Sequence, residues 1–301
     1  MKEKFVLLDV GGTQIKAGLA DQSGWIEKTV NYPACAMESS EKIFANFAAI
    51  IRSTAAQTEE GELRGIGMAF PGPFDYEKGV CLIQGLHKYD SIYGMSVADE
   101  IRKRVPGFEN VPFVFCHDAE AFALGEVWLG LDRADSVLCL CIGTGTGSAY
   151  IRDGRIIKSG KGVPPDGWIY KLPYKEGVVD DYISARGLEA LGKQYLGRAV
   201  TGKELYELCG KNDAGAQKAM QRFGWEFSRC VTPLVERFSP DTVVLGGQIA
   251  KSFPYFGQDF ENECSRREIR LYLEYETSVR AMQGVLRRIM EKQREQAGSR
   301  I

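Results

Sequence analysis

The stretch that decides the fold reads Asp9-Val10-Gly11-Gly12-Thr13. It lies between an apolar run at 5–8 and an alternating run at 15–20, which predicts a strand, a tight turn and a second strand. Adjacent glycines allow positive φ and let backbone amides approach an anion, and an acid at the strand end can hold a hydrated metal ion. The stretch fits a nucleoside triphosphate with magnesium. Alone, it fits an ordinary Gly-Gly hairpin equally well.

The composition is that of an ordinary globular protein. The chain has 301 residues, of which 44% are hydrophobic and 26% charged, so we expect two lobes. A net charge of −2 with scattered Lys and Arg offers no global attraction to a phosphate backbone, so we expect no nucleic-acid partner. No run approaches a membrane span and the chain opens into a strand rather than a signal peptide. We therefore expect a cytoplasmic protein without membrane contact.

Strands and helices alternate along the first part of the chain. We expect strands near 65–69 and 112–116 and helices near 41–57 and 95–104, which is an α/β pattern. A strand at 137–142 then leads into a second glycine-rich turn, Gly143-Thr144-Gly145-Thr146-Gly147. Because the opening hairpin recurs, the sequence predicts two related lobes facing each other across a cleft.

The second part is dominated by helices. After a Gly/Pro-rich loop at 159–180, helices are expected near 184–196, 201–210 and 213–238, followed by a strand that ends in Gly246-Gly247. Apolar residues line one face of the last helix, which predicts packing against one lobe. They are Val279, Met282, Leu286 and Ile289.

These elements predict two α/β domains. The N-terminal lobe spans 1–116 and is completed by the helix 279–295, and the C-terminal lobe spans 117–278.

Several segments, in this order, resemble the ROK family of sugar kinases and related regulators within the actin-like ATPase superfamily. They are the hairpin 9–19, Ala69-Phe70-Pro71-Gly72-Pro73, the segment 117–126, the turn 143–147 and Leu245-Gly246-Gly247. Each segment is weakly specific alone, but together they cover nearly the whole chain. The resemblance implies an α/β, two-lobed actin-like ATPase fold, which is ribonuclease H-like, with a central cleft.

The resemblance also implies where ATP and Mg²⁺ bind. Asp9 would hold magnesium through water. The implied phosphate-binding residues are Gly11, Gly12 and Thr13 in the first turn and Thr144, Gly145 and Gly147 in the second, with Gly246 and Gly247 beside the adenosine. The role of Lys16, close to the first turn, stays open.

Asp118 resembles the catalytic base of the family, which takes the proton from the attacking sugar hydroxyl. A carboxylate in the first turn of a helix stays ionised, so it can accept a hydrogen bond from a hydroxyl. The alternative is a simple helix N-cap. Gly72 and Asp118 belong to the implied substrate site, together with His117, which stands where the family commonly has Asn. The competing interpretation of His117 is a structural histidine.

The loop at 159–180 departs from the family pattern. The family's zinc module, a histidine followed by a CxCGxxGC cluster, is absent, so we predict no structural zinc. Where the family usually has Gly-Glu-x-Gly-His, this chain has Asp166 and Trp168, a carboxylate and a stacking face for a sugar ring. A Pro-Asp-Gly turn with a loop-covering Trp is the alternative. Without the zinc we expect packing to hold the loop through Trp168, Tyr170, Leu172 and Tyr174.

Other candidates are weaker. The eight cysteines lack CxxC spacing and are interpreted as reduced core residues, with a metal or redox pair at Cys139 and Cys141 as the alternative. His87 lies in a loop where relatives often have Asn-Leu-x-x-Trp, and substrate contact and a plain surface role are both open.

Two functions remain in view. The first is an ATP- and Mg²⁺-dependent kinase acting on a hydroxyl of a hexose or hexose derivative. The second is a non-catalytic sugar- or nucleotide-binding regulator. The strand that begins by Phe5 leaves no space for the helix-turn-helix of family repressors, so we expect no DNA-binding domain. Expected partners are a sugar and ATP, with a homodimer as a further option.

Overall fold

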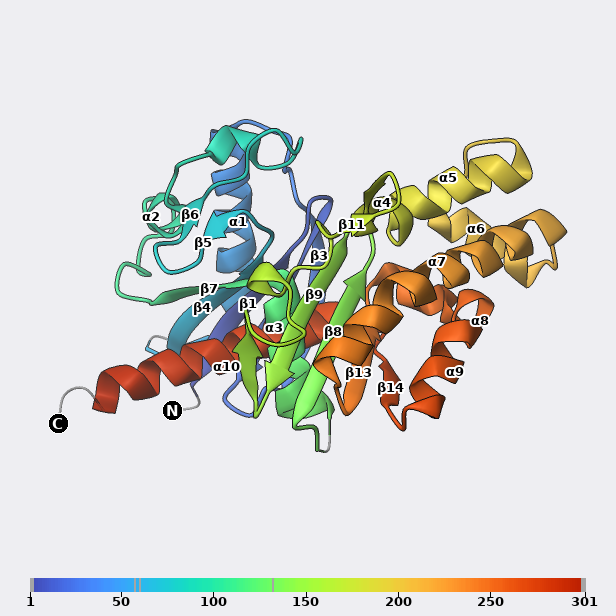
Figure 1. Ribbon diagram of the computed structural model, residues 1–301. Helices are drawn as coiled ribbons and strands as arrows, with labels where there is room; N and C mark the ends of the chain where they lie inside the picture. Colours follow the sequence, from blue (N-terminus) through green and yellow to red (C-terminus); the bar gives the residue numbers. More distant parts are fainter. Residues whose placement is uncertain (1–2, 57, 60, 132, 299–301) are drawn as a thin grey trace. The chain divides into compact units, whose positions relative to one another are not determined.

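The computed structural model describes residues 3–56, 58–59, 61–131 and 133–298 (Figure 1). Contacts divide the chain into two compact units. The first is Met1–Leu131 with Ser278–Ile301, and the second is Asp132–Thr277. Each unit is built on one five-stranded sheet.

The first sheet is a meander extended by parallel strands. Its strands are β1 (Lys4–Val10), β2 (Gln14–Asp21), β3 (Ile26–Pro33), β4 (Leu63–Phe70) and β7 (Phe113–His117). Their order is β3-β2-β1-β4-β7, with β1, β2 and β3 antiparallel and β1, β4 and β7 parallel. The carboxyl ends of β1, β4 and β7 therefore meet at one edge, where open α/β sheets bind their ligands.

Helices cover both faces of this sheet. The other elements of the unit are α1 (Ser40–Ala55), β5 (Phe74–Asp75), β6 (Val80–Cys81), η1 (Asp90–Ile92), α2 (Val97–Arg102), α3 (Asp118–Gly125), η2 (Glu126–Gly130) and α10 (Thr277–Gly298). Side chains alternate along β1, so Leu8 joins the cluster that contains Phe47 of α1, whereas Leu7 joins Leu286 of α10. Figure 1 shows α10 in red along the blue strands of the first sheet.

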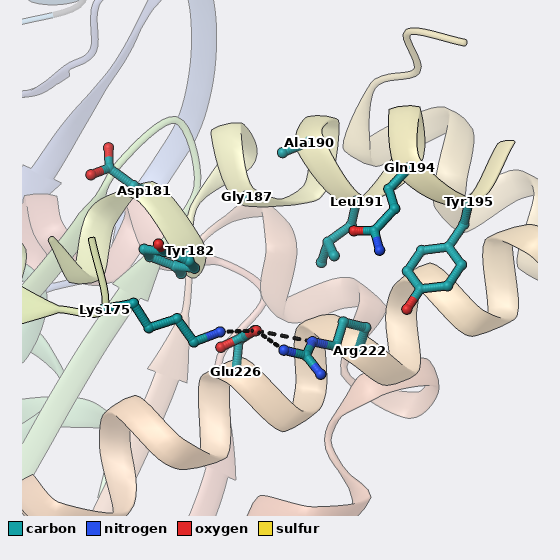
Figure 2. A pocket seen from close by; sticks show the side chains of 10 residues that line it. All are labelled: Lys175, Asp181, Tyr182, Gly187, Ala190, Leu191, Gln194, Tyr195, Arg222 and Glu226. Atoms are coloured by element: carbon teal, nitrogen blue, oxygen red, sulfur yellow. Dashed lines mark hydrogen bonds and ion pairs between the residues drawn. The ribbon is translucent and has the colours of Figure 1, made fainter. Parts of the chain in front are cut away.

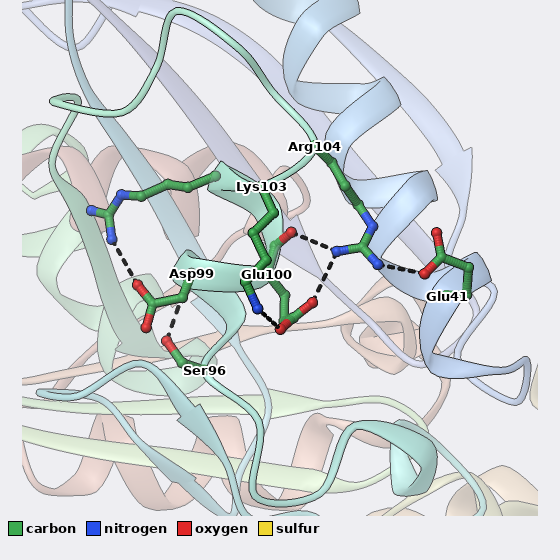
Figure 3. A network of polar contacts seen from close by, with 7 residues as sticks. Glu41, Ser96, Asp99, Glu100, Lys103 and Arg104 are labelled. Atoms are coloured by element: carbon green, nitrogen blue, oxygen red, sulfur yellow. Dashed lines mark hydrogen bonds and ion pairs between the residues drawn. The ribbon is translucent and has the colours of Figure 1, made fainter.

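A polar network joins α1 and α2 (Figure 3). Arg104, just after α2, donates to Glu100 Oε2 at 2.9 Å and to Glu41 of α1. Ser96 caps α2 by accepting the Asp99 amide. Ion pairs that stay partly open to water contribute at most about 1 kcal/mol each, so the apolar clusters carry the stability of the unit.

The second sheet repeats the topology of the first. Its strands are β8 (Ser136–Ile142), β9 (Thr146–Arg152), β10 (Arg155–Ile157), β13 (Thr242–Gly246) and β14 (Arg270–Leu273). Their order is β10-β9-β8-β13-β14, again an antiparallel meander with two strands parallel to its first member. The expectation that the opening hairpin recurs is confirmed, because β8 occupies the place of β1.

The helical part of the second unit lies in the connections of this sheet. The elements are η3 (Pro165–Gly167), β11 (Pro173–Tyr174), β12 (Gly177–Val178), α4 (Val179–Tyr182), α5 (Ala185–Leu196), α6 (Gly202–Gly210), α7 (Ala214–Phe238), η4 (Gln248–Ser252), α8 (Phe253–Phe256) and α9 (Gln258–Arg266). Asp213 caps the long α7 by accepting the Ala216 amide at 2.9 Å. Within the described residues no helix is both long and apolar enough to cross a membrane.

α3 and α10 approach each other at glycines. A Cβ on Gly125 of α3 would lie 1.9 Å from the Arg280 carbonyl oxygen, and one on Gly284 of α10 would lie 1.7 Å from the Ala121 carbonyl oxygen. These contacts place α3 in the first unit, although the sequence interpretation began the second lobe at residue 117. The expected apolar stripe of the last helix is confirmed, because its residues belong to the cluster beneath β1.

Candidate functional site

The turn between β1 and β2 is held by its own backbone. The Gly11 amide donates to the Gln14 carbonyl at 2.9 Å, and the Gly11 carbonyl accepts from the Tyr89 hydroxyl at 2.8 Å. Gly12 and Thr13 are exposed. The turn therefore presents the amides of these two residues, rather than that of Gly11, to an anion.

The expectation of positive φ in this turn is wrong, because neither Gly11 nor Gly12 lies in the left-handed region. Close approach explains Gly11 instead. A Cβ there would lie 2.8 Å from the Gln14 carbonyl oxygen, a distance that no side chain tolerates.

Asp9 lies near the end of β1 in a charged setting. In the sheet it stands opposite Lys16 and beside Ala69. Burial, with a smaller contribution from Asp118, raises the pKa of Asp9 to about 6, against a hydrogen bond from Ser278 and the charge of Lys16. A carboxylate whose ionisation is opposed by burial and by a neighbouring acid suits a bound cation, which would stabilise its charge.

Asp118 and His117 lie at the same sheet edge. β7 ends at His117 and α3 begins at Asp118, so the acid is the first helical residue rather than the N-cap. Asp118 Oδ1 accepts the Ala119 amide at 2.7 Å and lies 3.5 Å from His117 Nδ1, and the Asp118 side chain is 45% exposed. An interaction with the next amide is not the capping bond to N2 or N3, which disfavours the N-cap alternative.

Gly72 and Tyr76 surround the imidazole of His117. The Tyr76 ring meets His117 edge-on with centroids 5.9 Å apart, and its hydroxyl donates to the Phe70 carbonyl at 3.1 Å. A Cβ on Gly72 would lie 3.6 Å from His117 Cδ2. The imidazole is therefore fixed in orientation, as a hydroxyl-binding group needs to be.

The turn between β8 and β9 has a carboxylate support. The Gly143 amide donates to the Gly145 carbonyl at 2.9 Å, and the Thr146 amide donates to Asp180 Oδ1 at 2.6 Å. The other oxygen of Asp180 accepts from Arg186. Thr144 and Gly145 are exposed, so this turn also presents two consecutive amides.

The glycines of the second turn have space around them. A Cβ on Gly145 would meet Asp180 Oδ1 at 3.4 Å, and one on Gly143 would have its nearest contact at 4.0 Å, to the Gln248 amide nitrogen. Both are ordinary van der Waals distances. The fold by itself does not require glycine at either position.

The remaining glycines of the second sheet lie beside this turn. Gly147 of β9 and Gly246 of β13 both pair with Cys141 of β8, one from each side. Gly247 has φ +90°, and a Cβ there would lie 2.2 Å from the Ile142 carbonyl oxygen. Its amide donates to Thr277 Oγ1 at 2.8 Å.

Asp166 and Trp168 belong to a loop fixed to β9. Ser148 Oγ donates to the Gly167 carbonyl at 2.6 Å. Asp166 is exposed with φ 58°, inside the expected Pro-Asp-Gly turn, and Trp168 packs against Tyr170 with ring centroids 5.9 Å apart. The Pro-Asp-Gly turn is therefore present, and it leaves the Asp166 carboxylate accessible to a ligand.

A buried glutamate anchors the later part of this loop (Figure 2). Glu226 of α7 is 4% exposed and accepts from Lys175, from Tyr174 at 2.7 Å and from Arg222 at 2.7 Å. Burial opposes its ionisation, but the hydrogen bonds from these partners lower the pKa of Glu226 overall. Figure 2 shows Lys175 and Arg222 reaching the carboxylate from opposite sides, so the β11–β12 hairpin is held on α7.

The anchor adds to the expected packing. Leu172 and Tyr174 pack against the core of the second unit, as the sequence predicted, and Ile169 is fully buried. The residues around Glu226 also line a pocket of about 410 Å³ beside α5, and no candidate site residue is among them. Among the described residues, no group of three or more His, Cys, Asp or Glu side chains is arranged to hold a metal.

The candidate residues form two groups, one in each unit. The group in the first unit is Asp9, Gly11, Gly12, Thr13, Gly72, His117 and Asp118. The group in the second unit is Thr144, Gly145, Gly147, Asp166, Trp168, Gly246 and Gly247. Six of the eight cysteines are buried, and Cys35 and Cys141 are partly exposed.

Sequence reasoning missed the side chains that support these groups. They are Tyr76, Tyr89, Asp180, Thr277 and Ser278. Each acts on a residue far away in the chain, except Tyr76, so no local spacing could reveal it. The one available signal was a Ser at the start of the last helix, a usual helix-start residue.

Paired sheets of one topology, each with a glycine turn after its first strand, define the two-lobed actin-like ATPase fold. A solved neighbour is a ROK family glucokinase from Streptomyces griseus in complex with glucose and AMPPNP, with a TM-score of 0.76 at 18% identity, covering 94% of this chain and 98% of that one. A ROK family transcriptional regulator, a homologue of the E. coli MLC protein, has a TM-score of 0.78 at 14% identity, covering 96% and 78%. The expected fold class is confirmed.

The family model that matches is the ROK family, over residues 5–282, and the chain belongs to this family. An N-acetyl-D-glucosamine kinase of Aliivibrio salmonicida is 27% identical over 261 residues, 80% of this chain and 83% of that protein. A glucokinase of Thermotoga maritima is 26% identical over 274 residues, 83% of this chain and 84% of that protein.

Proposed function

We propose that the chain is an ATP-dependent sugar kinase, which transfers the γ-phosphoryl group of MgATP to a hydroxyl of a hexose or hexose derivative. The observation that supports it best is the position of Asp118. This acid lies at the sheet edge where β1 ends and the first turn begins, and it is close enough to Asp9 to raise the pKa of Asp9. The sugar kinases among the relatives support the same reaction class.

Asp118 acts as the general base in this proposal. Its carboxylate accepts a hydrogen bond from the attacking hydroxyl and takes the proton as the new O–P bond forms. The N-terminus of α3 favours the ionised form that this role needs. Most of the acceleration comes from positioning the hydroxyl in line and from neutralising phosphate charge.

The nucleotide is assigned to the two turns. The amides of Gly12 and Gly145 donate to phosphate oxygens, as do the amides and hydroxyls of Thr13 and Thr144. Gly246 and Gly247 lie beside the adenosine. Asp9 holds hydrated Mg²⁺, which when bound neutralises phosphate charge.

Besides Asp118, the sugar is assigned to His117, Asp166, Trp168 and Gly72. His117 donates or accepts a hydrogen bond, Asp166 accepts, and Trp168 stacks on an apolar face of the ring. Gly72 leaves space beside the imidazole. N-Acetylated amino sugars and glucose are the first substrates to test, since these are the sugars named for the relatives.

A second candidate is a binding protein without catalysis. The likeness to a ROK family transcriptional regulator favours it, because the same fold serves both functions in the family. His117 and Asp166 also stand where the family pattern has other residues. The kinase remains the better supported proposal, because the regulator needs neither Asp118 nor Asp9.

An ADP-release assay with MgATP and a panel of hexoses, ketohexoses and N-acetylated amino sugars tests the proposal. Turnover with one sugar, reduced by at least about 100-fold in Asp118→Asn with MgATP binding retained, is the expected result. Sugar binding without ADP release would identify the regulator instead. Near-normal turnover in Asp118→Asn would remove the assigned base.

We also propose a cytoplasmic location, where MgATP is available. The homodimer stays a prediction, which analytical ultracentrifugation tests.

A further inference from the structure

Lys88 lies against the first turn. A Cβ placed on Gly12 would lie 3.3 Å from Lys88 Cδ and 4.0 Å from Lys88 Cβ, so the aliphatic part of the lysine covers this glycine. The side chain is half-buried, whereas the neighbouring Gly85, Leu86 and His87 are exposed. A lysine is therefore packed beside the amides that the turn presents to an anion.

The backbone that carries Lys88 is fixed at the residue that follows it. Tyr89 is fully buried, donates its hydroxyl to the Gly11 carbonyl at 2.8 Å, and donates its amide to the Ala36 carbonyl at 2.6 Å. His87 and Tyr89 have φ of 54° and 59°, a region that L-residues rarely adopt. Such strain persists only where the surroundings over-determine it, and it is frequent at ligand-binding sites.

The charge of Lys88 has no protein counter-ion in the part of the chain that the structure describes. Lys42, by contrast, pairs with Glu38 at 2.9 Å, and Lys175 pairs with Glu226. A lysine ammonium beside exposed amides makes an anion site, because it adds a point charge to oriented N–H donors. The other interpretation is a lysine that only covers Gly12 with its stem while its charge stays in water.

We propose that Lys88 is a phosphate-binding residue, whose ammonium donates to a terminal phosphate oxygen of ATP held at the β1–β2 turn. The geometry favours this role over sugar binding, because the stem of Lys88 runs along Gly12. The inference rests on the proposed kinase function for its effect on turnover. Its effect on nucleotide affinity stands on binding alone.

Two substitutions separate charge from packing. Lys88→Met keeps an unbranched apolar stem over Gly12 and removes the ammonium, and Lys88→Arg keeps a positive charge. Lys42→Met, on the surface of α1, is the matched control for loss of one lysine charge. Calorimetric titration of MgATP, MgADP and AMP without sugar measures affinity independently of catalysis, and thermal unfolding measures any structural role.

We expect Lys88→Met to weaken MgATP by about tenfold or more, since a hydrogen bond to a charged group is lost. MgADP should weaken less, AMP should not change, and the unfolding temperature should match that of Lys42→Met. Lys88→Arg should retain most of the MgATP affinity. If wild type shows no turnover with any sugar but this binding pattern appears, the kinase proposal fails and the assignment of Lys88 stands.

Three results with the Lys88→Met variant would overturn the assignment. The first is unchanged MgATP affinity in Lys88→Met with normal turnover, which leaves the kinase intact. The second is an equal loss for all three nucleotides with a lowered unfolding temperature, which is a structural effect. The third is a rise in the KM for sugar alone, which would assign Lys88 to the sugar-binding site. Absence of MgATP binding in wild type would overturn both proposals.

Discussion

The β1–β2 and β8–β9 turns occupy the same place in two sheets of the same topology, yet they are built differently. The first follows a strand that carries Asp9, whereas the second follows a strand with Cys141 at the corresponding position. Glycine is sterically required at Gly11 but not at Gly145. The first turn therefore has a carboxylate beside its exposed amides. The second turn has exposed amides but no acid at the equivalent strand position.

This difference separates two reasons for a glycine. At Gly11 the reason lies inside the protein, since a Cβ would strike the Gln14 carbonyl. At Gly145 the space beside the turn is free, so a reason for glycine there has to come from a ligand. The substitutions below test that distinction, in decreasing order of their effect on turnover.

Asp9→Asn should lower turnover most, by about 100-fold or more, because a neutral amide cannot hold hydrated Mg²⁺ as a carboxylate does. Cys141→Ala, at the equivalent position of the second sheet, is the control and should stay close to wild type. Steady-state rates with varied MgCl₂ measure both. Equal losses in the two variants would contradict the asymmetry of the turns.

Gly145→Ala should weaken MgATP by about tenfold or more, because its Cβ would keep a phosphate oxygen from approaching the backbone amide, while the unfolding temperature stays unchanged. Gly11→Ala should lower the unfolding temperature even without ligand, because its Cβ meets the Gln14 carbonyl. Titration calorimetry and thermal unfolding on the same samples measure both quantities. A destabilised Gly145→Ala with unchanged affinity would reverse the assignment.

Asp180→Asn tests the carboxylate that supports the second turn. Asn keeps an oxygen that can accept the Thr146 amide, so we expect affinity for MgATP to fall by about fivefold at most, with kcat nearly unchanged. Asp180→Ala, which removes the acceptor of the Thr146 amide, should lower the affinity for MgATP further. A collapse of kcat in Asp180→Asn would mean that this acid takes part in the chemistry, as Asp9 is proposed to do.

Substitution of Glu226 should have the smallest effect on turnover and a clear effect on stability. Glu226→Gln should lower the free energy of unfolding by about 2 kcal/mol at pH 7, because three donors lose a charged acceptor. The folded-state pKa of Glu226 lies below its usual 4.5, so its stabilisation is present above that value and is lost as pH falls through the folded pKa.

Urea unfolding at several pH values should therefore show the difference between wild type and Glu226→Gln shrinking below about pH 4.5. The control is Glu176→Gln, since Glu176 accepts from Tyr182 at the surface and should show little difference at any pH. A difference that grows in acid would contradict the sign of the shift.

Much of the fold was predictable, because it depends on local pattern. Alternation and glycine turns located both hairpins, and the residues of α7 were predicted to within one position. The helix expected at 95–104 is shorter, Val97–Arg102, since Ser96 caps its start and Pro106 disfavours helix at Val105, just beyond its end. The ROK family assignment, made from motifs in order, is confirmed.

Less of the site was predictable. The positions of Asp9 and Asp118 follow from strand ends. The hydrogen bond from Ser278 to Asp9 was not predictable, because the two residues are far apart in the sequence. The positive φ expected at Gly11 failed because the same Gly-Gly pair serves turns of different geometry, and only the backbone decides. The Glu226 anchor joins residues that are 51 and 52 positions apart.

The close crossing of α3 and α10 sets a constraint on helical phase. Ser278, at the start of α10, bonds Asp9, and Gly284 sits against the Ala121 carbonyl of the helix that begins at Asp118. One helix therefore positions both acids. An insertion or deletion of a single residue between Ser278 and Gly284 would turn one contact by about 100° relative to the other, because each residue advances the helix by that angle.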